Sequence, residues 1–344
     1  MKENILKFVN EITLYTGTYG KKRCTCSCIG CSQERYGRMH EDYQGTLEQI
    51  DIIIEKLPNL KNAYILGNPD ISVDTEFCNL AAKRFIERGI KVQFSTSGFN
   101  GVETLKILLN GIEPKNIEYI SYSVDTTDEE KLRYLKGSNK IELKKIEEAV
   151  RYCIQNNITT KIQPTLWEIN QDDYEDIINY FYDKCNIRWF TFHCGSFESC
   201  DTKSPLRHIK PEKWKEISQN LFKIAEEKNI KLKVPKIFFK EEEVNEYSKN
   251  FSPNCINGKC GIQIWMQKNG LKATLCPLLA ETNPEKIIFD IEKESPKLLE
   301  AHKNCPICDR FIDEDLKKES IDGKGRKFMT DNGKFYTACR YSKA

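Results

Sequence analysis

Between residue 10 and about residue 200, short apolar segments alternate with amphipathic ones, and this alternation constrains the fold more than any other feature. The apolar segments are rich in β-branched and aromatic residues, as buried strands are, and they cover residues 12–16, 63–66, 92–95, 117–124, 160–165 and 188–193. Asp74 is the predicted N-cap of one intervening helix, whose predicted buried stripe is Phe77, Leu80, Ala81 and Phe85. Six strand–helix units in succession predict an α/β fold, in which a parallel sheet curls into a partial (β/α)6 barrel with its helices outside.

The alternation weakens after about residue 200. Residues 211–229 predict a helix and residues 231–234 a strand, followed by a Lys/Glu-rich segment. From Ser252 the chain is rich in Cys, Gly and Pro and too loop-rich to fold on a hydrophobic core alone. A bound metal that stabilises this region is therefore expected. The sequence therefore predicts three parts: a barrel over residues 10–200, a helical bridge over 201–250, and a small cysteine-rich iron–sulfur domain over 251–344.

Charge and hydropathy exclude several classes of protein. The 53 Lys and Arg nearly cancel the 51 Asp and Glu, and a net charge of +2 predicts no nucleic-acid footprint. No apolar run approaches the roughly 18 residues that a membrane-spanning helix needs. Glu3, Lys7 and Glu11 interrupt the N-terminal segment, so it does not resemble a secretory signal. We therefore expect a cytoplasmic protein with neither nucleic acid nor membrane as a partner.

Fifteen cysteines are the main anomaly of the composition. In a reducing cytosol, cysteines at close, fixed spacing indicate metal ligands or catalytic groups rather than disulfides. One group consists of Cys24, Cys26, Cys28 and Cys31. The other consists of Cys255, Cys260, Cys276, Cys305, Cys308 and Cys339. The simplest interpretation is two metal centres at opposite ends of the sequence.

The first group follows the first predicted strand, at the end of the sheet where active sites lie in such folds. Thiolates are the usual ligands of iron–sulfur clusters. The spacing of Cys24, Cys28 and Cys31 lets one short loop wrap a four-iron cube and hold three of its irons. The remaining iron is then open to chelate a small molecule through an amine and a carboxylate. Cys26 is expected to point away from the cube.

This cysteine spacing, in its strand context, resembles the radical S-adenosylmethionine (SAM) superfamily. The resemblance covers about residues 10–200. It implies a 4Fe–4S cluster that binds S-adenosyl-L-methionine and breaks its S–C5′ bond with one electron. The resulting 5′-deoxyadenosyl radical then abstracts a hydrogen from the substrate. The chain departs from the family at Gly30, where an aromatic residue often provides a stacking contact for adenine.

The resemblance also implies cofactor contacts at the ends of the later strands. Residues 67–70 stand where the family has a Gly-Gly-Glu type of turn, residues 95–98 are similar to its Thr-Asn-Gly, and residues 121–125 to its Ser-x-Asp signature. The implied cofactor-binding residues are Gly67, Asn68, Asp70, Ser95, Ser97, Ser123, Asp125 and Arg133, with Asn170 as a weaker candidate. An ordinary structural turn or helix cap is the alternative for each.

The distal cysteines are similar to the auxiliary-cluster region called SPASM, or Twitch in its shorter form. No cysteine lies near Glu314 or Lys318, so the Twitch form fits better. The implied ligands of this second 4Fe–4S cluster are Cys260, Cys276, Cys305 and Cys308, with Cys255 and Cys339 as alternative ligands. A zinc site is the other interpretation of these thiols.

His193 and Cys194 end the last barrel strand and are the candidate catalytic residues. Alternation points one of them into the barrel. His193 would act as a base or hydrogen-bond donor, and Cys194 would return a hydrogen atom to a substrate radical. A satisfied structural histidine and a small core cysteine are the alternatives.

Together these features predict a radical SAM oxidoreductase or maturase that oxidises, cross-links or epimerises a peptide or peptide-like substrate. The alternative is a dehydrogenase or epimerase of a small molecule such as a sugar or an amino acid. A non-catalytic zinc-binding or iron–sulfur-binding protein is the alternative of another class. A reducing flavodoxin or ferredoxin is the implied electron donor.

Overall fold

The computed structural model describes residues 5–16, 24, 26–30, 45–67, 70–195, 205–207, 209–236, 238–239, 241–251, 261–268, 270–274, 289–293, 311–312 and 335–336. Its main sheet has ten strands in the order β12-β11-β10-β1-β2-β3-β4-β5-β7-β9. The strands from β10 to β9 are parallel to one another, and β11 and β12 are antiparallel additions at one edge. The bounds are β1 (Glu11–Tyr15), β2 (Asn62–Leu66), β3 (Lys91–Thr96), β4 (Ile117–Tyr122), β5 (Thr160–Ile162), β7 (Trp189–Thr191), β9 (Lys231–Lys233), β10 (Gly261–Gln267), β11 (Gly270–Thr274) and β12 (Phe289–Asp290).

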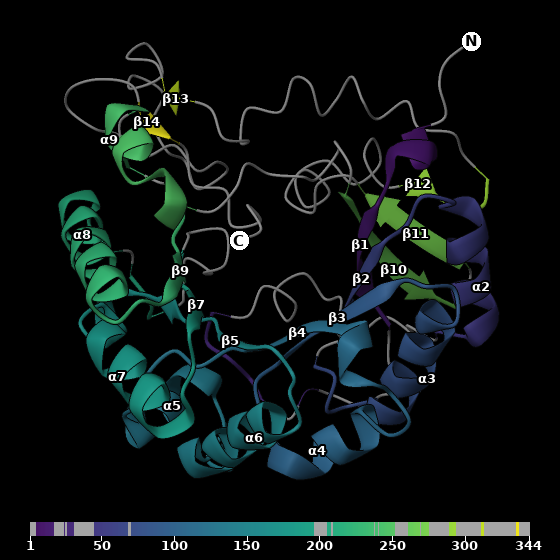
Figure 1. Ribbon diagram of the computed structural model, residues 1–344, viewed down its shortest axis with the longest axis horizontal. Coiled ribbons are helices and arrows are strands. Elements are labelled where there is room, and N and C mark those ends of the chain that lie inside the picture. Colours follow the sequence, from purple (N-terminus) through teal and green to yellow (C-terminus); the bar gives the residue numbers. More distant parts are fainter. Residues whose placement is uncertain are drawn as a thin grey trace.

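Helices cover the convex side of the sheet, which gives the molecule the outline of an open horseshoe (Figure 1). In chain order they are α2 (Leu47–Lys56), α3 (Thr75–Ile86), α4 (Gly101–Leu108), α5 (Glu129–Lys136), α6 (Leu143–Gln155), α7 (Tyr174–Cys185), α8 (Pro211–Glu227) and α9 (Glu241–Glu246). The predicted α/β fold with a mostly parallel sheet is confirmed. No helix in the described part of the chain is both long and apolar enough to cross a bilayer.

Alternation along the strands separates the two faces of the sheet. In β1, Ile12 and Leu14 are fully buried in the main hydrophobic core, which they share with helix residues such as Phe85. Tyr15 belongs to the opposite, concave face, where its ring stacks on Trp265 of β10 with centroids 5.5 Å apart. The core therefore lies between sheet and helices, and the concave face is left to the functional site.

The buried stripe predicted for α3 is partly wrong. Asp74 is the N-cap residue as expected, and Ala81 and Phe85 are buried. Leu80, however, is 47% exposed, and Cys78 is fully buried instead. The helix is rotated relative to the prediction because α3 packs against both α2 and α4, so its buried face is set by two neighbours at once.

The last two barrel strands are shorter than predicted. The segment 160–165 divides into β5 and β6 (Thr165–Leu166), and the segment 188–193 into β7 and β8 (His193–Cys194). The break falls at Pro164, which has no N–H to continue the ladder. Its carbonyl accepts a hydrogen bond from His193 N at 2.8 Å, and β6 then pairs with β8 in a separate small sheet.

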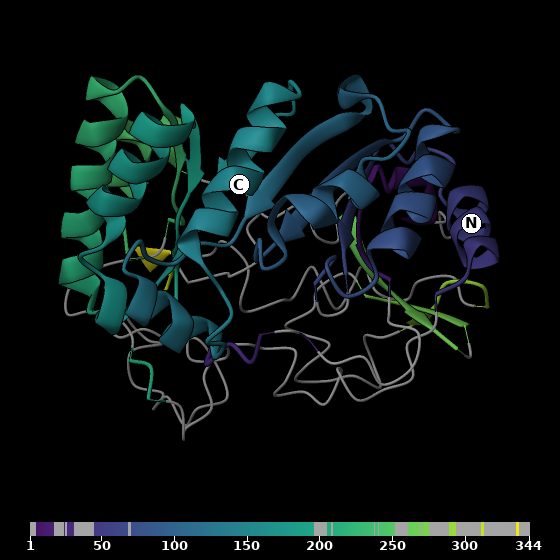
Figure 2. The ribbon, with the colours of Figure 1, turned by 90° about the horizontal axis from the view of Figure 1, so that it is seen from below.

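The sheet is extended beyond the six predicted units at both edges. On one side β9, which coincides with the predicted strand 231–234, pairs with β7. On the other side β10 pairs with β1 in parallel register, with Ile12 opposite Ile262. Figures 1 and 2 both show β10 and β11, in light green, beside β1. Two further strands, β13 (Phe311–Ile312) and β14 (Phe335–Tyr336), form an antiparallel pair of their own.

Candidate functional site

The carboxyl ends of β2 and β3 are joined by the Asp70 carboxylate. One of its oxygens accepts hydrogen bonds from Ser72 N at 2.9 Å and Thr96 Oγ1 at 3.1 Å, and the other accepts one from Ser97 N at 2.7 Å. A Cβ at Gly67 would overlap the backbone of Asp70, so this turn requires glycine. Asp70 therefore holds the turn together, as the structural interpretation expected. Asn68 lies outside the described residues.

Two serines of the predicted cofactor set lie at the carboxyl end of β3, Ser95 within the strand and Ser97 directly after it. Ser95 lies beside the Tyr64 hydroxyl, to which it hydrogen-bonds. Ser97 Oγ is buried and has no hydrogen-bond partner among the described residues. A buried hydroxyl without a partner costs free energy. Ser97 is therefore suited to a polar group of a bound molecule.

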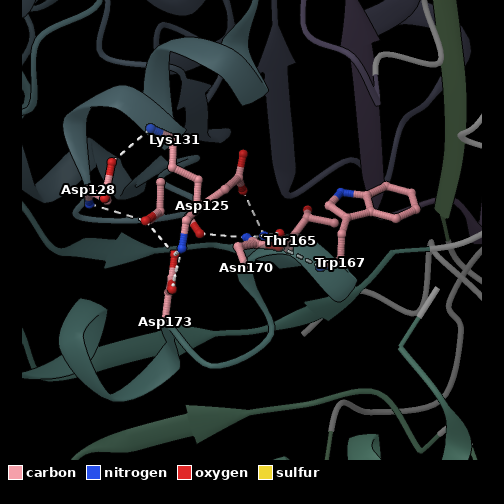
Figure 3. A network of polar contacts seen from close by, with 8 residues as sticks. Asp125, Asp128, Lys131, Thr165, Trp167, Asn170 and Asp173 are labelled. Carbon is pink, nitrogen blue, oxygen red and sulfur yellow. Dashed lines mark hydrogen bonds and ion pairs between the residues drawn. The ribbon is translucent and has the colours of Figure 1, made fainter. Parts of the chain in front are cut away.

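Asp125 lies at the centre of a buried polar network at the end of β4 (Figure 3). Its Oδ1 accepts a hydrogen bond from Thr165 N at 2.8 Å, and its carbonyl accepts one from Asn170 Nδ2 at 2.6 Å. Asn170 Oδ1 in turn accepts from Trp167 N at 2.7 Å. The network joins β4 to the segment after β5, so Asn170, the weaker sequence candidate, has a positioning role.

The second oxygen of Asp125 holds Lys136, the last residue of α5, which the sequence analysis missed. Lys136 Nζ lies 2.7 Å from Asp125 Oδ2 and 3.0 Å from Ser123 Oγ, and only 5% of its side chain is exposed. Burial opposes the charged amine, but the nearby Asp125 carboxylate raises the pKa of Lys136 above its ordinary value. A lysine at the end of a helix is usually exposed to solvent. The position of Lys136 in the sequence therefore did not indicate that it lies at the site.

The cysteine loop docks onto the same end of α5. Ile29 N donates a hydrogen bond to Leu135 O at 3.1 Å. Gly137, the C-cap of α5, has φ +56°, and a Cβ there would overlap the Ser27 carbonyl. The left-handed conformation and the close approach both favour glycine. These contacts of Leu135 and Gly137 therefore place the cysteine loop directly beside Lys136.

Three thiols of the loop lie close together. Cys26 N lies 3.4 Å from Cys24 Sγ, and the Cys26 thiol hydrogen-bonds to both Cys24 and Cys28. The hydrogen bond to Cys24 is the main reason that the pKa of Cys26 is raised to about 11. The hydrogen bond to Cys26, together with burial, raises the pKa of Cys28. Cys26 is buried within the hydrophobic core, whereas Cys24 and Cys28 are half-buried against it.

This donor set fits an iron–sulfur cluster, although the described residues do not complete it. All described cysteines are free thiols. No three described His, Cys, Asp or Glu side chains form a complete metal site. The third predicted ligand, Cys31, lies outside the described residues. So do Cys255, Cys260, Cys276, Cys305, Cys308 and Cys339, the predicted auxiliary ligands and their alternatives.

The space beside Gly30 is filled by Trp167. A Cβ at Gly30 would lie 3.1 Å from Trp167 Cζ2 and 3.2 Å from Leu206 Cδ1. The indole also meets Gly195, where a Cβ would overlap the ring. The indole thus lies against two glycines and is only 5% exposed. An aromatic ring therefore lies next to the cysteine loop even though residue 30 is a glycine. This ring belongs to Trp167, in the segment after β6.

His193 and Cys194 face opposite ways, as alternation requires. His193 Nε2 lies 2.6 Å from Gln163 Nε2, on the concave side, where Gln163 Oε1 is buried without a partner among the described residues. Cys194 packs against the hydrophobic core, and burial raises the pKa of its thiol to about 12. This placement favours the interpretation of Cys194 as a core residue. Of the two candidate catalytic residues, only His193 then faces the site.

Arg133 lies elsewhere on α5. Its guanidinium pairs with Glu129 at 2.6 Å and reaches the Ile141 carbonyl at 3.5 Å. Both partners of the ion pair are more than a third exposed. This arrangement favours the helix-stabilising interpretation of Arg133 over a cofactor contact.

Replacing Gly137 with alanine is expected to displace the cysteine loop. The new Cβ would meet the Ser27 carbonyl, and the residue would also have to keep a positive φ. Gly89→Ala is the matched control, because Gly89 has φ +74° but nothing within 4 Å of an added Cβ. We expect both variants to lose about 1 kcal/mol through backbone strain. Only Gly137→Ala should lose iron, as measured by iron analysis after anaerobic reconstitution, and equal iron contents would contradict this account of the docking.

The comparison with protein families agrees with this geometry. Residues 21–181 match the model described as the Radical SAM superfamily. This part of the chain, from the cysteine loop to α7, is therefore a radical SAM domain, and the resemblance inferred from the cysteine spacing is confirmed. No curated protein sequence matches the chain.

Solved structures share the fold at low sequence identity. Streptococcus suis SuiB bound to S-adenosylmethionine has a TM-score of 0.56 and 16% identity, over 87% of this chain and 67% of SuiB. SuiB bound to the precursor peptide SuiA has a TM-score of 0.57 and 15% identity, over 87% of this chain and 66% of SuiB. Native anSMEcpe with bound AdoMet and the Kp18Cys peptide has a TM-score of 0.64 and 14% identity, over 95% of this chain and 92% of anSMEcpe. The chain thus spans about two thirds of SuiB and nearly all of anSMEcpe.

Proposed function

We propose that this chain is an enzyme that binds a 4Fe–4S cluster through Cys24, Cys28 and Cys31 and reductively cleaves S-adenosyl-L-methionine. The observation that carries the proposal is the cysteine loop. This loop belongs to a radical SAM domain, and its thiols lie close together at the carboxyl ends of the strands, beside the buried Lys136. When bound, the cluster supplies the electron that cleaves the S–C5′ bond and so generates a 5′-deoxyadenosyl radical.

The chain's own side chains would bind and orient the nucleoside and methionine groups. Ser97 offers a buried hydroxyl, and Gly67, which the tight turn after β2 requires, offers its backbone. Ser95, Ser123 and Asn68 complete the proposed set of contacts. Asp70 and Asp125 support these residues rather than contact the ligand directly, since hydrogen bonds occupy the Asp70 carboxylate, and Thr165 N and the Lys136 amine occupy that of Asp125.

We propose a peptide as the substrate, modified by oxidation, cross-linking or epimerisation. The proposal is supported by the likeness in fold to SuiB and anSMEcpe, whose structures hold the peptides SuiA and Kp18Cys. His193 is the proposed proton-transfer or hydrogen-bonding group toward that substrate, because it faces the concave side. If Gln163 donates through Nε2, the neutral ring carries its proton on Nδ1. Dehydrogenation or epimerisation of a small molecule is the second candidate.

A second 4Fe–4S cluster bound by Cys260, Cys276, Cys305 and Cys308 also belongs to this proposal, with Cys255 or Cys339 as substitutes. Its motivation is their spacing in the sequence. A flavodoxin or ferredoxin is the proposed reductant. If the distal thiols bound zinc, only the proposed second cluster would be wrong, and the proposal for the N-terminal loop would stand.

Anaerobic purification and a turnover assay test the proposal. We expect a brown protein with about eight iron atoms per chain, the content of two four-iron clusters. With dithionite and S-adenosylmethionine it should release 5′-deoxyadenosine, which liquid chromatography with mass spectrometry detects. Deuterium transferred into 5′-deoxyadenosine from a labelled peptide, but not from labelled sugars or amino acids, would support the peptide substrate. A colourless protein with zinc and no iron would overturn the enzyme proposal.

A further inference from the structure

Two buried polar atoms at the carboxyl ends of neighbouring strands have no hydrogen-bond partner among the described residues. They are Gln163 Oε1, directly after β5, and Thr191 Oγ1, at the end of β7. The Thr191 side chain is fully buried, and that of Gln163 is half-buried. A buried hydroxyl or amide without a partner costs free energy, because it loses its hydrogen bonds to water and gains none in return. Both atoms are therefore suited to a polar group that a bound molecule supplies.

The register of the sheet makes Gln163 and Thr191 neighbours. Tyr122 of β4 lies opposite Ile162 of β5, and Ile162 lies opposite Phe190 of β7. All three of these side chains belong to the hydrophobic core. The next residue along each strand faces the concave side, because successive side chains alternate, and adjacent strands are about 4.8 Å apart. These residues form one row on the concave face: Ser123, Gln163 and Thr191.

This row connects the proposed cofactor contacts to the proposed proton-transfer group. Ser123, at one end of the row, belongs to the proposed set of contacts to S-adenosylmethionine. His193 follows Thr191 by two positions and therefore faces the same side of the sheet. Its Nε2 lies 2.6 Å from Gln163 Nε2, so the nitrogen of the Gln163 amide is engaged and its oxygen is the atom left without a partner. Gln163 and Thr191 thus adjoin both the cofactor half of the site and His193.

The two atoms match the hydrogen-bonding groups of a single residue in an extended peptide. In an extended chain the N–H and the C=O of one residue point to the same side, as they do in a hydrogen-bonded pair of an antiparallel sheet. Gln163 Oε1 can only accept a hydrogen bond, so it requires a donor such as a peptide N–H. The Thr191 hydroxyl can donate to the C=O of the same residue. Such binding reads the main chain of the peptide and not its side chains.

We propose that Gln163 and Thr191 form a substrate subsite that binds the backbone N–H and C=O of one residue of an extended peptide. This inference rests on the proposed function and deepens it, since it names the part of the peptide that is recognised. A residue held through both backbone groups has its Cα and side chain in a defined position. Abstraction of one particular hydrogen requires such positioning.

Peptide analogues that lack one N–H test the proposal. The probes are short alanine-rich peptides, acetylated and amidated, that differ in one deuterated central residue. Deuterium in 5′-deoxyadenosine, measured by mass spectrometry, identifies the peptide that reacts. That peptide is remade without deuterium, once with its central N–H and once with an ester oxygen in its place, and both are measured as competitive inhibitors. We expect the ester to bind about tenfold more weakly to the native enzyme, because Gln163 Oε1 is left without a donor.

Two variants locate the effect in the subsite. Gln163→Leu and Thr191→Val should each bind the amide peptide about tenfold more weakly than the native enzyme. In Gln163→Leu, the ester should bind no more weakly than the amide. Thr191→Val keeps the shape of the side chain and removes a hydroxyl to which no described residue is hydrogen-bonded, so the free energy of unfolding should be unchanged or higher. A purely structural hydroxyl would give the reverse, lower stability with native peptide binding.

Thr13→Val is the matched control. Thr13 lies between the core residues Ile12 and Leu14 of β1, so it too faces the concave side. It is 2% exposed, and in the described part of the chain its hydroxyl likewise has no partner. It pairs with Tyr64 in the middle of β2, away from the carboxyl ends of the strands. Its replacement should leave peptide binding unchanged.

The proposal is wrong if the ester and the amide bind equally to the native enzyme, or if Thr191→Val binds the amide peptide as well as Thr13→Val does. Should Gln163→Leu fail to fold, the ester in the native enzyme and Thr191→Val decide between them. A loss of affinity in both supports the subsite, and native affinity in either overturns it.

These outcomes are distinct from failure of the proposed function. A native protein that releases no 5′-deoxyadenosine would refute the radical SAM activity itself. Release of 5′-deoxyadenosine without deuterium from any of the peptides would refute the peptide substrate, and this inference with it. An enzyme that takes deuterium from a peptide, with variants that bind amide and ester as the native protein does, would refute only the subsite.

Discussion

The Cys28→Ala variant is expected to lose the iron of the N-terminal loop and all dithionite-dependent release of 5′-deoxyadenosine. Three thiolates are needed to hold a cube that has one open iron. Cys28 is the central ligand in sequence and lies half-buried, within reach of the Lys136 charge. Iron content after anaerobic reconstitution should fall by about four atoms per chain, the content of one cluster. The far-ultraviolet circular dichroism should stay native, because the loop is outside the helices and strands of the barrel.

Cys26→Ala is the control in the same loop. Cys26 is 3% exposed and belongs to the hydrophobic core, so its removal leaves a small cavity and costs about 1 kcal/mol. Iron and 5′-deoxyadenosine release should remain near the native values. If Cys26→Ala loses the cluster while Cys24→Ala retains it, Cys26 is the ligand and the assignment of Cys24 is wrong.

The Asp125→Ala variant is expected to lower the free energy of unfolding by about 3–5 kcal/mol, the usual cost of leaving a buried charge without its partner. The truncation leaves Lys136 buried, with its side chain 5% exposed, and removes the acceptor of Thr165 N. Urea unfolding of the protein as purified, followed by circular dichroism, measures the difference. The same variant should bind less iron, because the cysteine loop docks on the residues around Lys136.

Glu103→Ala provides the comparison for that result. Glu103 forms an ion pair with Lys106 at 2.8 Å, but both side chains are more than half exposed. Solvent screens such pairs, and no measurable loss of stability is expected. Equal effects of Asp125→Ala and Glu103→Ala would show that the Asp125–Lys136 pair contributes no more than a surface pair.

Local patterns predicted much of the fold and the side of the sheet on which the site lies. A period of two at His193 and Cys194 required them to face opposite ways, which the structure shows. The first four strands end within two residues of their apolar runs, and the first three landmarks of the cofactor site, at Gly67, Ser97 and Asp125, follow β2, β3 and β4. These features depend on residues that are close together in the chain, so they could be predicted from the sequence.

Other features depend on residues that are distant in the chain. The periodicity of α3 could not decide that Leu80 is exposed, because two neighbouring helices select the buried face. The pairing of β1 with β10 joins residues about 250 positions apart. No local signal predicted that Gly30 makes room for Trp167, since that contact is created by the segment after β6.

By itself, the sequence determined the α/β class and the radical SAM domain, because apolar periodicity and the spacing of Cys24, Cys28 and Cys31 are local properties. Only the tertiary structure decided which charged residues serve the site. Arg133 and Lys136 lie one helical turn apart on α5, yet Arg133 pairs with Glu129 at the surface and Lys136 is buried against Asp125. Their partners decide between them: Arg133 pairs with Glu129 one turn back on its own helix, whereas Lys136 meets Asp125 and lies between Leu135 and Gly137, which both contact the cysteine loop.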